Sequence, residues 1–271
     1  MNGLSPFQFL LFPLTHAELG RAFQLQSALE WGTLPSLLDI TSDADRARYL
    51  RTYVQMYLKE EILVEQLIRK LDPFRLFLPV AAQMSGEPVN ASNIARDTGV
   101  DYKTIQSYYQ ILVDTHLGFF LEPYGGSVRE VQKKSPKFYF FDYGVKRALG
   151  NELRVPLIER TPEYGRAFET WLINECFRLN AYHELDFRFS YLRTKDDAEI
   201  DLIIERPGQK LALVEIKSAR QVDDRHLKHI SSFARDFPKA DLIVASRVDR
   251  AQKHGRIAIL PWMQALRELG C

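Results

Sequence analysis

The sequence predicts an α+β protein: a helical N-terminal region with a winged helix-turn-helix, followed by a mixed sheet flanked by helices. In the first part of the chain, apolar residues recur every three and four positions, which is typical of helices that pack on one face. From about Thr161 onward, short runs rich in β-branched residues alternate with amphipathic segments, which indicates strands covered by helices. A chain of 271 residues has room for one large domain or two to three small ones. We expect a helical linker or lid region over 1–84, a winged helix-turn-helix over 85–150 and the sheet domain over 155–271.

Two helices are expected in the N-terminal region. An apolar stripe runs from Asp43 to Leu71, Ser42 or Asp43 can cap its start, and Asp72-Pro73 ends it. A second, nearly all apolar helix spans Phe74–Met84 and stops at Ser85-Gly86.

A helix-turn-helix pattern follows. Asn90 starts a short helix, and Gly99 supplies a left-handed turn. Asp101 caps a longer helix that runs through Leu117. Apolar runs at Phe119–Pro123 and Pro136–Asp142 predict two paired strands. Helices followed by a β-hairpin form a winged helix.

The C-terminal part alternates helices with strands, which predicts a mixed sheet between helices. The expected elements are a helix at Glu163–Leu179, strands at Asp186–Leu192, Ile200–Glu205 and Leu211–Ile216, a helix at Arg225–Phe237, a strand at Ala240–Ala245 and a helix at Pro261–Leu269.

Charged residues interrupt two of these apolar strands. Asp201 lies in one strand, Glu215 and Lys217 in the next, and a Pro207-Gly208 turn separates the strands. Side chains two positions apart on a strand point to one face, so Glu215 and Lys217 emerge together. If the register brings Asp201 to that face, two carboxylates and an ammonium converge. Because burying unpaired charge is costly, such a cluster normally has a metal, a substrate or a partner charge.

These residue types suit metal-dependent hydrolysis of a phosphodiester. Asp201 and Glu215 are hard oxygen ligands for Mg²⁺ or Mn²⁺, and Lys217 can position or activate water. Glu169, on the helix expected to cover the sheet, is the first candidate to complete the ligand set, and Glu175 is the second. The alternative is an internal salt bridge between Lys217 and either strand carboxylate.

Several short motifs follow one another along the chain: Pro13-Leu14 with Glu18-Leu19, Trp31-Gly32-Thr33-Leu34-Pro35, Ser135-Pro136-Lys137, Phe141-Asp142-Tyr143-Gly144, Phe168-Glu169, Glu199-Ile200-Asp201 and Val214-Glu215-Ile216-Lys217. The last three resemble the PD-(D/E)XK nuclease superfamily, which has a restriction-endonuclease-like fold. The whole set resembles the carboxyl-terminal part of prokaryotic AAA-type ATPases that carry a nuclease-like domain of unknown function. The resemblance implies catalytic roles for Glu169, Asp201, Glu215 and Lys217, with the three carboxylates as metal ligands.

The ATP-binding part of such proteins has no counterpart here. No G-x-x-x-x-G-K-[ST] motif occurs, so we do not expect this chain to bind or hydrolyse ATP by itself. It is either a fragment of a longer ATPase or the descendant of one that lost its motor, and a separate ATPase or protein partner is expected to accompany it.

Nucleic-acid contacts are expected from the winged helix. The longer helix exposes Lys103 and Gln106, and the hairpin region is more basic, because it carries Arg129, Lys133, Lys134 and Lys137. The alternative is that the winged helix only packs against neighbouring parts. His226 and His229, one helical turn apart, are interpreted as a solvated face rather than a metal site.

Bulk composition excludes several classes of protein. A net charge of +1 gives no global sign of nucleic-acid binding, so any basic surface must be local. No apolar run reaches the length of a membrane span, and the first 14 residues lack a signal-peptide pattern. Cys176 and Cys271 offer no disulfide framework or metal spacing. We therefore expect a cytoplasmic protein without a membrane partner.

Two functions remain open at this point. The first is a metal-dependent nuclease-like enzyme. The second is a non-catalytic module that binds DNA or a protein through the winged helix and an inactive nuclease-like fold.

Overall fold

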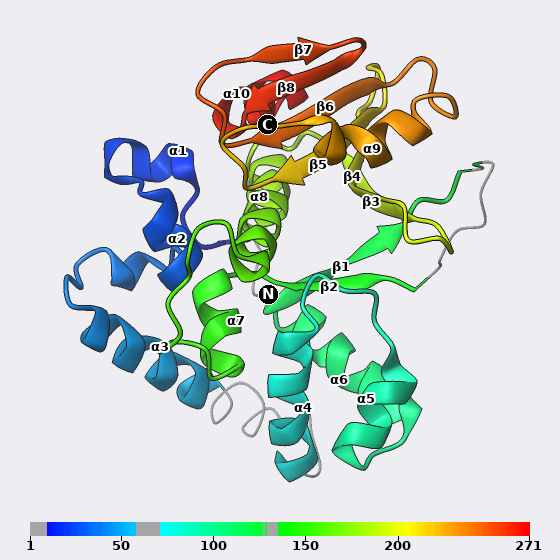
Figure 1. Cartoon of the computed structure of the whole chain (residues 1–271). Coiled ribbons are helices and arrows are strands. Elements are labelled where there is room, and N and C mark those ends of the chain that lie inside the picture. Colours follow the sequence, from blue (N-terminus) through cyan, green and yellow to red (C-terminus); the bar gives the residue numbers. More distant parts are fainter. Residues whose placement is uncertain (1–9, 58–70, 127, 129–134) are drawn as a thin grey trace, which may run out of the picture.

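The computed structural model describes residues 10–57, 71–126, 128 and 135–271 of the chain. Helices dominate its first half and pack in the lower part of Figure 1, whereas most strands lie in the upper part with α8 beneath them. The helices are α1 (His16–Leu19), α2 (Leu25–Trp31), α3 (Asp43–Tyr57), α4 (Leu71–Gln83), α5 (Ala91–Thr98), α6 (Tyr102–Asp114), α7 (Tyr143–Leu149), α8 (Pro162–Tyr182), α9 (Asp224–Phe233) and α10 (Trp262–Leu269), with two 3₁₀ turns at Gly20–Ala22 and Pro35–Leu37. No helix among the described residues is both long and apolar enough to span a bilayer.

The strands form one mixed sheet in the order β2-β1-β3-β4-β5-β6-β8-β7. They are β1 (Gly118–Pro123), β2 (Lys137–Phe140), β3 (Arg188–Arg193), β4 (Glu199–Glu205), β5 (Ala212–Lys217), β6 (Asp241–Ser246), β7 (Gln252–His254) and β8 (Ile257–Pro261). The β1–β3, β5–β6 and β6–β8 pairs are parallel, and the other pairs are antiparallel. The expected α+β class, with an N-terminal helical region and a mixed sheet flanked by helices, is thus confirmed.

The helix-turn-helix segment follows its sequence signals closely. Asn90 caps α5, Gly99 has the left-handed conformation (φ 69°), and the Asp101 side chain accepts from the Thr104 N–H at the start of α6. The longer helix ends three residues earlier than expected, at Asp114, because His116 takes a left-handed backbone (φ 58°) and turns the chain into β1.

The segment around Pro73 differs from the expectation. The expected Asp43–Leu71 helix is described as α3 up to Tyr57, and residues 58–70 lie outside the described part of the chain. Asp72-Pro73 was expected to end that helix, but it lies in the first turn of α4. Proline is tolerated there because the first N–H groups of a helix have no intrahelical partner.

Two of the sequence motifs meet at the junction of α2 and α7. The buried Asp142 carboxylate caps α7 at the Val145 N–H (3.0 Å) and also accepts from the Thr33 N–H (2.8 Å). Gly144 packs directly on the backbone of Trp31, since a Cβ there would lie 1.9 Å from the Trp31 carbonyl oxygen. The motifs at residues 31–35 and 141–144 therefore form one structural contact.

The hairpin is joined to the C-terminal sheet. β1 pairs with β3 through Glu122↔Ser190 and Pro123↔Tyr191, so β1 and β2 form one edge of the eight-stranded sheet. Side chains alternate between the two faces of the central strands: Leu202 and Ile204 pack with α8 and α10, and Ile203 packs with α9.

Five of the named helices and strands were not predicted, and two of them, α1 and α2, are only four and seven residues long. α7 is only seven residues long, and β7 consists of exposed residues without apolar alternation. β8 ends in Pro261, which the sequence indicated as the first residue of the last helix. These elements are short or polar, and tertiary packing rather than local pattern forms them.

Candidate functional site

The candidate site lies where β4 and β5 separate. Their ladder covers only Leu202–Ile204 opposite Ala212–Val214. Beyond it, the Asp201 carboxylate replaces a backbone acceptor, because its Oδ2 accepts from the Ile216 N–H at 2.7 Å. A side chain thus bridges the gap between two strands, and this fixes Asp201 beside the end of β5.

Lys217 joins the two strand carboxylates. Its Nζ lies 2.6 Å from Glu215 Oε1 and 3.7 Å from Asp201 Oδ2. The Glu215 side chain is 2% exposed, and its Oε2 has no hydrogen-bond partner among the described residues. One buried carboxylate oxygen in this cluster is therefore available to a ligand.

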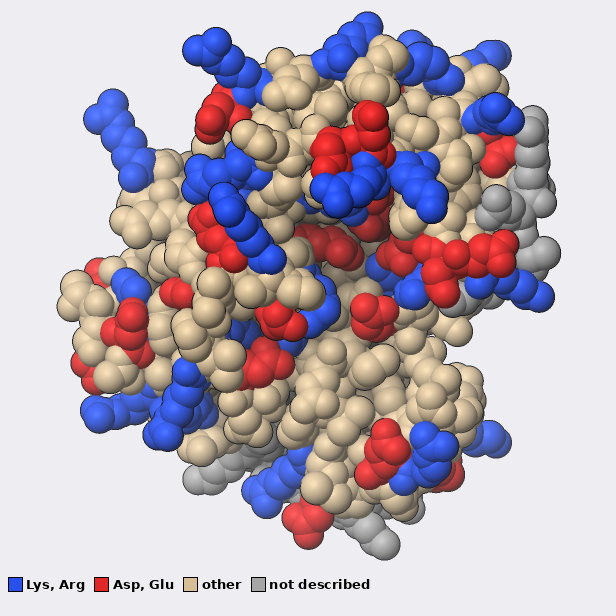
Figure 2. Space-filling view, in the orientation of Figure 1, with Lys and Arg blue, Asp and Glu red and all other residues tan. Residues whose placement is uncertain are grey.

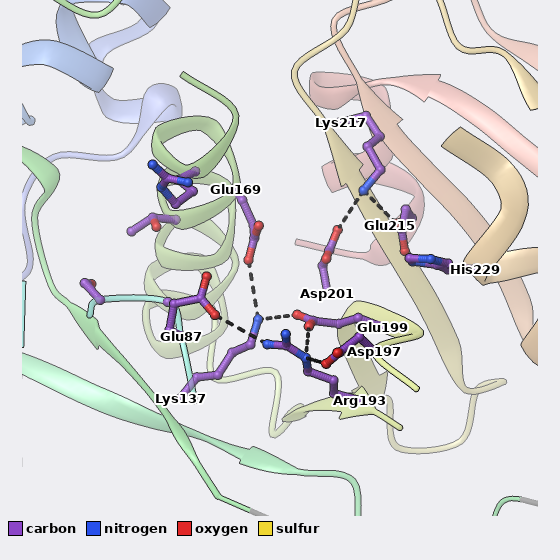
Figure 3. A pocket seen from close by; sticks show the side chains of 14 residues that line it. Glu87, Lys137, Glu169, Arg193, Asp197, Glu199, Asp201, Glu215, Lys217 and His229 are labelled. Carbon is purple, nitrogen blue, oxygen red and sulfur yellow. Dashed lines mark hydrogen bonds and ion pairs between the residues drawn. The ribbon is translucent and has the colours of Figure 1, made fainter. Parts of the chain in front are cut away.

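A second group of charges faces the first. Glu169 comes from α8, Glu199 from β4 and Lys137 from β2 (Figure 3). Lys137 Nζ contacts Glu199 Oε1 and lies 3.7 Å from Glu169 Oε1, and the Tyr139 hydroxyl donates to Glu169 Oε1 at 3.2 Å. Oxygens of Glu169, Glu199 and Asp201 lie within 4.8 Å of one another.

Arg193, on β3, contacts three carboxylates at the edge of this group of charges. Its guanidinium lies 3.3 Å from Glu199 Oε2, 3.1 Å from Asp197 Oδ1 and 3.3 Å from Glu87 Oε2. Glu87 belongs to the segment between α4 and α5, so the helical part of the chain also contributes to the site.

These side chains line one cavity of about 270 Å³, which we call the acidic cavity. Acidic and basic side chains are gathered around a hollow near the centre of the face shown in Figure 2. Inside the cavity, the Lys137 group and the Lys217 group stand on opposite sides, with the carboxylates of Glu169, Glu199 and Asp201 between the two ammonium groups (Figure 3).

The carboxylates repel one another in a site of limited hydration. Burial, and after it the charge of Asp201, raises the pKa of Glu169 from 4.5 to about 7. The same two causes raise the pKa of Glu215 well above its usual value, and burial raises the pKa of Glu199 although Lys137 opposes the shift. Burial and mutual repulsion therefore disfavour the ionised form of these three carboxylates.

The pKa values of the two cavity lysines are also raised, which for a lysine favours the charged form. Burial alone lowers the pKa of Lys137, but Tyr139 and the carboxylates around it outweigh burial and raise it well above its ordinary value. Burial also opposes the ionisation of Lys217, and Asp201 with Glu215 raises its pKa nevertheless. Both ammonium groups stay charged at neutral pH.

The donor set fits a hard divalent cation. Glu169, Glu199 and Asp201 can hold a metal ion with one oxygen each, and the unpartnered Glu215 Oε2 lies in the same cavity. A bound cation would favour the ionised form of these carboxylates.

The structure brings together all four predicted catalytic residues, Glu169, Asp201, Glu215 and Lys217, around the acidic cavity. Glu175 lies elsewhere: it is fully buried, and its Oε1 accepts from the N–H and Nδ1 of His16, each at 2.6 Å. Of the two candidates on α8, only Glu169 reaches the site.

The predicted nucleic-acid residues are spread over different places. Lys103 and Gln106 are exposed on α6. Lys137, expected among the basic residues of the hairpin surface, instead has a side chain only 3% exposed inside the acidic cavity. Arg129, Lys133 and Lys134 lie outside the described residues.

The two histidines of α9 lie in different environments. His229 lines the acidic cavity near Glu215 (Figure 3), whereas His226 Nδ1 accepts from the Asp223 N–H at 3.2 Å in the helix cap. They do not act as a pair.

Sequence reasoning missed Glu199, Tyr139 and Arg193 as site residues and assigned Lys137 to nucleic-acid contacts instead. A signal was present for Glu199, because it is two positions before Asp201 on the same strand face. No local signal joins β2 or Arg193 to the site, because these contacts depend on how the hairpin and β3 pair.

Comparison with known proteins gives two domain matches. Residues 22–155 match the model of a domain of unknown function (DUF8612), and residues 164–265 match that of another domain of unknown function (DUF4143). The second is a domain found in AAA-ATPase-associated proteins.

Two curated relatives are similar over most of this chain. They are the uncharacterized proteins Rv2008c of Mycobacterium tuberculosis and Mb2031c of Mycobacterium bovis, each 26% identical over 245 residues. The matched region covers 83% of this chain and 53% of each relative, so the chain spans about half the length of these relatives.

Proposed function

We propose that the chain is a divalent-metal-dependent, nuclease-like phosphodiester hydrolase that acts on nucleic acid. The observation that carries the proposal is the convergence of Glu169, Asp201, Glu215 and Lys217 on one cavity where two strands separate. The order of these residues and the mixed sheet between helices support a PD-(D/E)XK nuclease-like fold.

Each residue has a role that its position supports. Asp201, Glu215 and Glu169 hold Mg²⁺ or Mn²⁺, and Glu199 adds a fourth carboxylate. A divalent ion in such a site supplies Lewis acidity toward the phosphate and a more acidic bound water. The Lys217 ammonium orients the attacking water or stabilises the negative charge that grows on the phosphate oxygens.

The N-terminal half has a role in binding. α5, α6 and the β1–β2 hairpin act as a winged helix, and Lys103 and Gln106 on the exposed side of α6 contact DNA. We also propose that a separate ATPase or other protein partner acts together with this chain in the cytoplasm; the matched region is about half of each curated relative.

A second function has one observation in its favour. Asp201, Glu199 and Glu215 each contact a lysine within the cavity, so the cluster is already charge-paired without a metal. This arrangement favours a non-catalytic module in which the same fold binds DNA or a protein.

Cleavage assays separate the two functions. The purified chain is incubated with supercoiled plasmid and with single-stranded DNA in Mg²⁺, Mn²⁺ or EDTA, beside Glu215→Ala, Lys217→Ala and the exposed control Lys239→Ala. We expect cleavage with a divalent ion by the unchanged chain and the control, and a loss of at least about 100-fold in both cavity variants. Metal-dependent cleavage that survives both variants, or no cleavage together with no effect of Mn²⁺ on thermal stability, rejects the hydrolase.

A further inference from the structure

A second, larger cavity of about 820 Å³ lies next to the acidic cavity. The two cavities share elements: β5 contributes Lys217 to the first and the adjoining Ser218 to the second, and α8 contributes Glu169 to the first and Pro162 to the second. Glu169 is seven positions after Pro162, which corresponds to about 10 Å along the axis of α8. A strand bound in the acidic cavity can therefore place a nearby phosphate in the second cavity.

Two arginines converge in this second cavity. Arg247, after β6, and Arg220, after β5, both donate to the same oxygen, Glu159 Oε1, the latter at 3.3 Å. The Arg247 guanidinium also lies over the ring of Tyr164, 5.0 Å from its centroid. We call the site formed by Arg220, Arg247 and Glu159 the arginine pocket.

Arg247 is the anchored member of the pair. Its side chain is only 10% exposed, yet its guanidinium donates a single hydrogen bond within the described part of the chain. Arginine carries five N–H donors in a planar fork that matches a phosphate. Arg247 lines the cavity, and its contact with the Tyr164 ring restricts the orientation of the guanidinium.

Glu159 occupies the position that an external anion would take. Its side chain is 44% exposed, so it can turn toward solvent when an anion replaces it on Arg247 and Arg220. The arginines lower the pKa of Glu159, Arg247 most, which shows that the pocket stabilises negative charge. Asp249 also lines the cavity and opposes an anion, but Arg160 lines it as well, so arginines outnumber carboxylates.

The start of α8 adds to this preference. Thr161 caps this 21-residue helix at the cavity wall, and a helix N-terminus carries a partial positive charge. The helix end supports the site but does not define it, because Arg220 and Arg247 are the groups that reach an anion.

We propose that the arginine pocket binds a phosphate of the nucleic-acid strand whose scissile phosphodiester lies in the acidic cavity, and that Glu159 moves out to admit it. The proposal rests on the proposed function for the identity of the ligand. It adds a binding site that sets how far a strand must extend beyond the point of hydrolysis.

Binding is measured in EDTA, so that no hydrolysis contributes. A 5′-fluorescein-labelled single-stranded DNA of 12 nucleotides is titrated by fluorescence anisotropy across a range of NaCl concentrations. The variants are Arg220→Gln, Arg247→Gln and Glu159→Gln, with Arg235→Gln as an exposed arginine control. Circular dichroism establishes that each variant is folded, and Arg220, with a side chain 60% exposed, gives a variant whose folding does not depend on a buried group.

We expect each cavity arginine variant to weaken binding about tenfold and to reduce the slope of log K against log salt by about 0.7, as for one lost phosphate contact. Glu159→Gln should tighten binding about threefold, because it removes the competing carboxylate. Arg235→Gln should leave both quantities within error.

Binding by folded Arg220→Gln and Arg247→Gln that equals binding by the unchanged chain overturns the proposal, as does weaker binding by Glu159→Gln. Sodium phosphate at matched ionic strength tests the source of the phosphate: protection of the chain by inorganic phosphate without any binding of the DNA also overturns it. A chain that binds DNA through the two arginines but cuts nothing refutes the hydrolase and keeps the pocket. A chain that cuts normally with both arginines replaced refutes the pocket alone.

Discussion

Replacing Glu169 with glutamine should make the metal-free protein more stable. Burial and Asp201 raise the pKa of this group from 4.5 to about 7, so ionisation of Glu169 opposes folding. Because the folded-state pKa is the higher one, stability is greatest below pH 4.5 and is lost as the pH rises toward 7. At 1.4 kcal/mol per unit, the ionised carboxylate costs about 3 kcal/mol at pH 8 but only about 0.8 kcal/mol at pH 5. Glutamine keeps the Oε1 acceptor that Tyr139 uses and removes the charge.

Urea unfolding in EDTA at pH 8 and pH 5 measures these two differences. The matched control is Glu163→Gln on the same helix, where the side chain is 59% exposed and the change should stay within about 0.5 kcal/mol. With Mn²⁺ at a hundred times its Kd, the unchanged protein should gain about 2.7 kcal/mol and Glu169→Gln much less, so the gap between them closes. A Glu169→Gln variant that is less stable than the unchanged protein in EDTA at pH 8 would show that the carboxylates do not strain this site.

Two further predictions concern the scaffold. Gly144→Ala should destabilise the fold by about 3 kcal/mol in urea unfolding, because its Cβ would meet the Trp31 backbone. The control Gly125→Ala, with open space around its Cβ, should cost less than about 0.5 kcal/mol. Equal losses of stability in the two variants would contradict the close approach of Gly144 to Trp31. Contact with the thiol of Cys176 lowers the pKa of Cys271, and the same contact together with burial raises the pKa of Cys176. A thiol reagent at pH 8 should therefore modify Cys271 in the folded protein and Cys176 only after denaturation. Simultaneous modification of both cysteines would refute this assignment.

The core of the site could be predicted because its signals are local. Glu215 and Lys217 lie two apart on a buried strand, and a charged pair in such a strand has one face to share. Asp201 needed one further assumption, that the adjacent strand places it on the same face, and the hairpin turn between the strands makes that register natural. Glu169 was preferred to Glu175 by its place on the covering helix, and Glu175, six positions later on the same helix, contacts His16 instead.

The remaining site residues depend on long-range pairing that no local pattern encodes. Lysine usually lies on the protein surface. Lys137 is buried because β2 pairs with β1 and β1 pairs with β3. The same is true of Cys176 and Cys271, which are distant in sequence and meet only because the chain end packs beside α8. Sequence periodicity predicts which face a side chain occupies, but it does not predict which strands become neighbours.

The position of Lys137 has a consequence for how the two halves of the chain work together. Its ammonium neutralises Glu169 and Glu199 from the hairpin side, while Lys217 neutralises Glu215 and Asp201 from within β5. A cation that binds these carboxylates competes with Lys137, so it would weaken the contact between the hairpin and the C-terminal sheet. Since β2 pairs with β1, which follows α6 in the chain, we expect occupancy of the acidic cavity and the placement of α5 and α6 to be energetically linked.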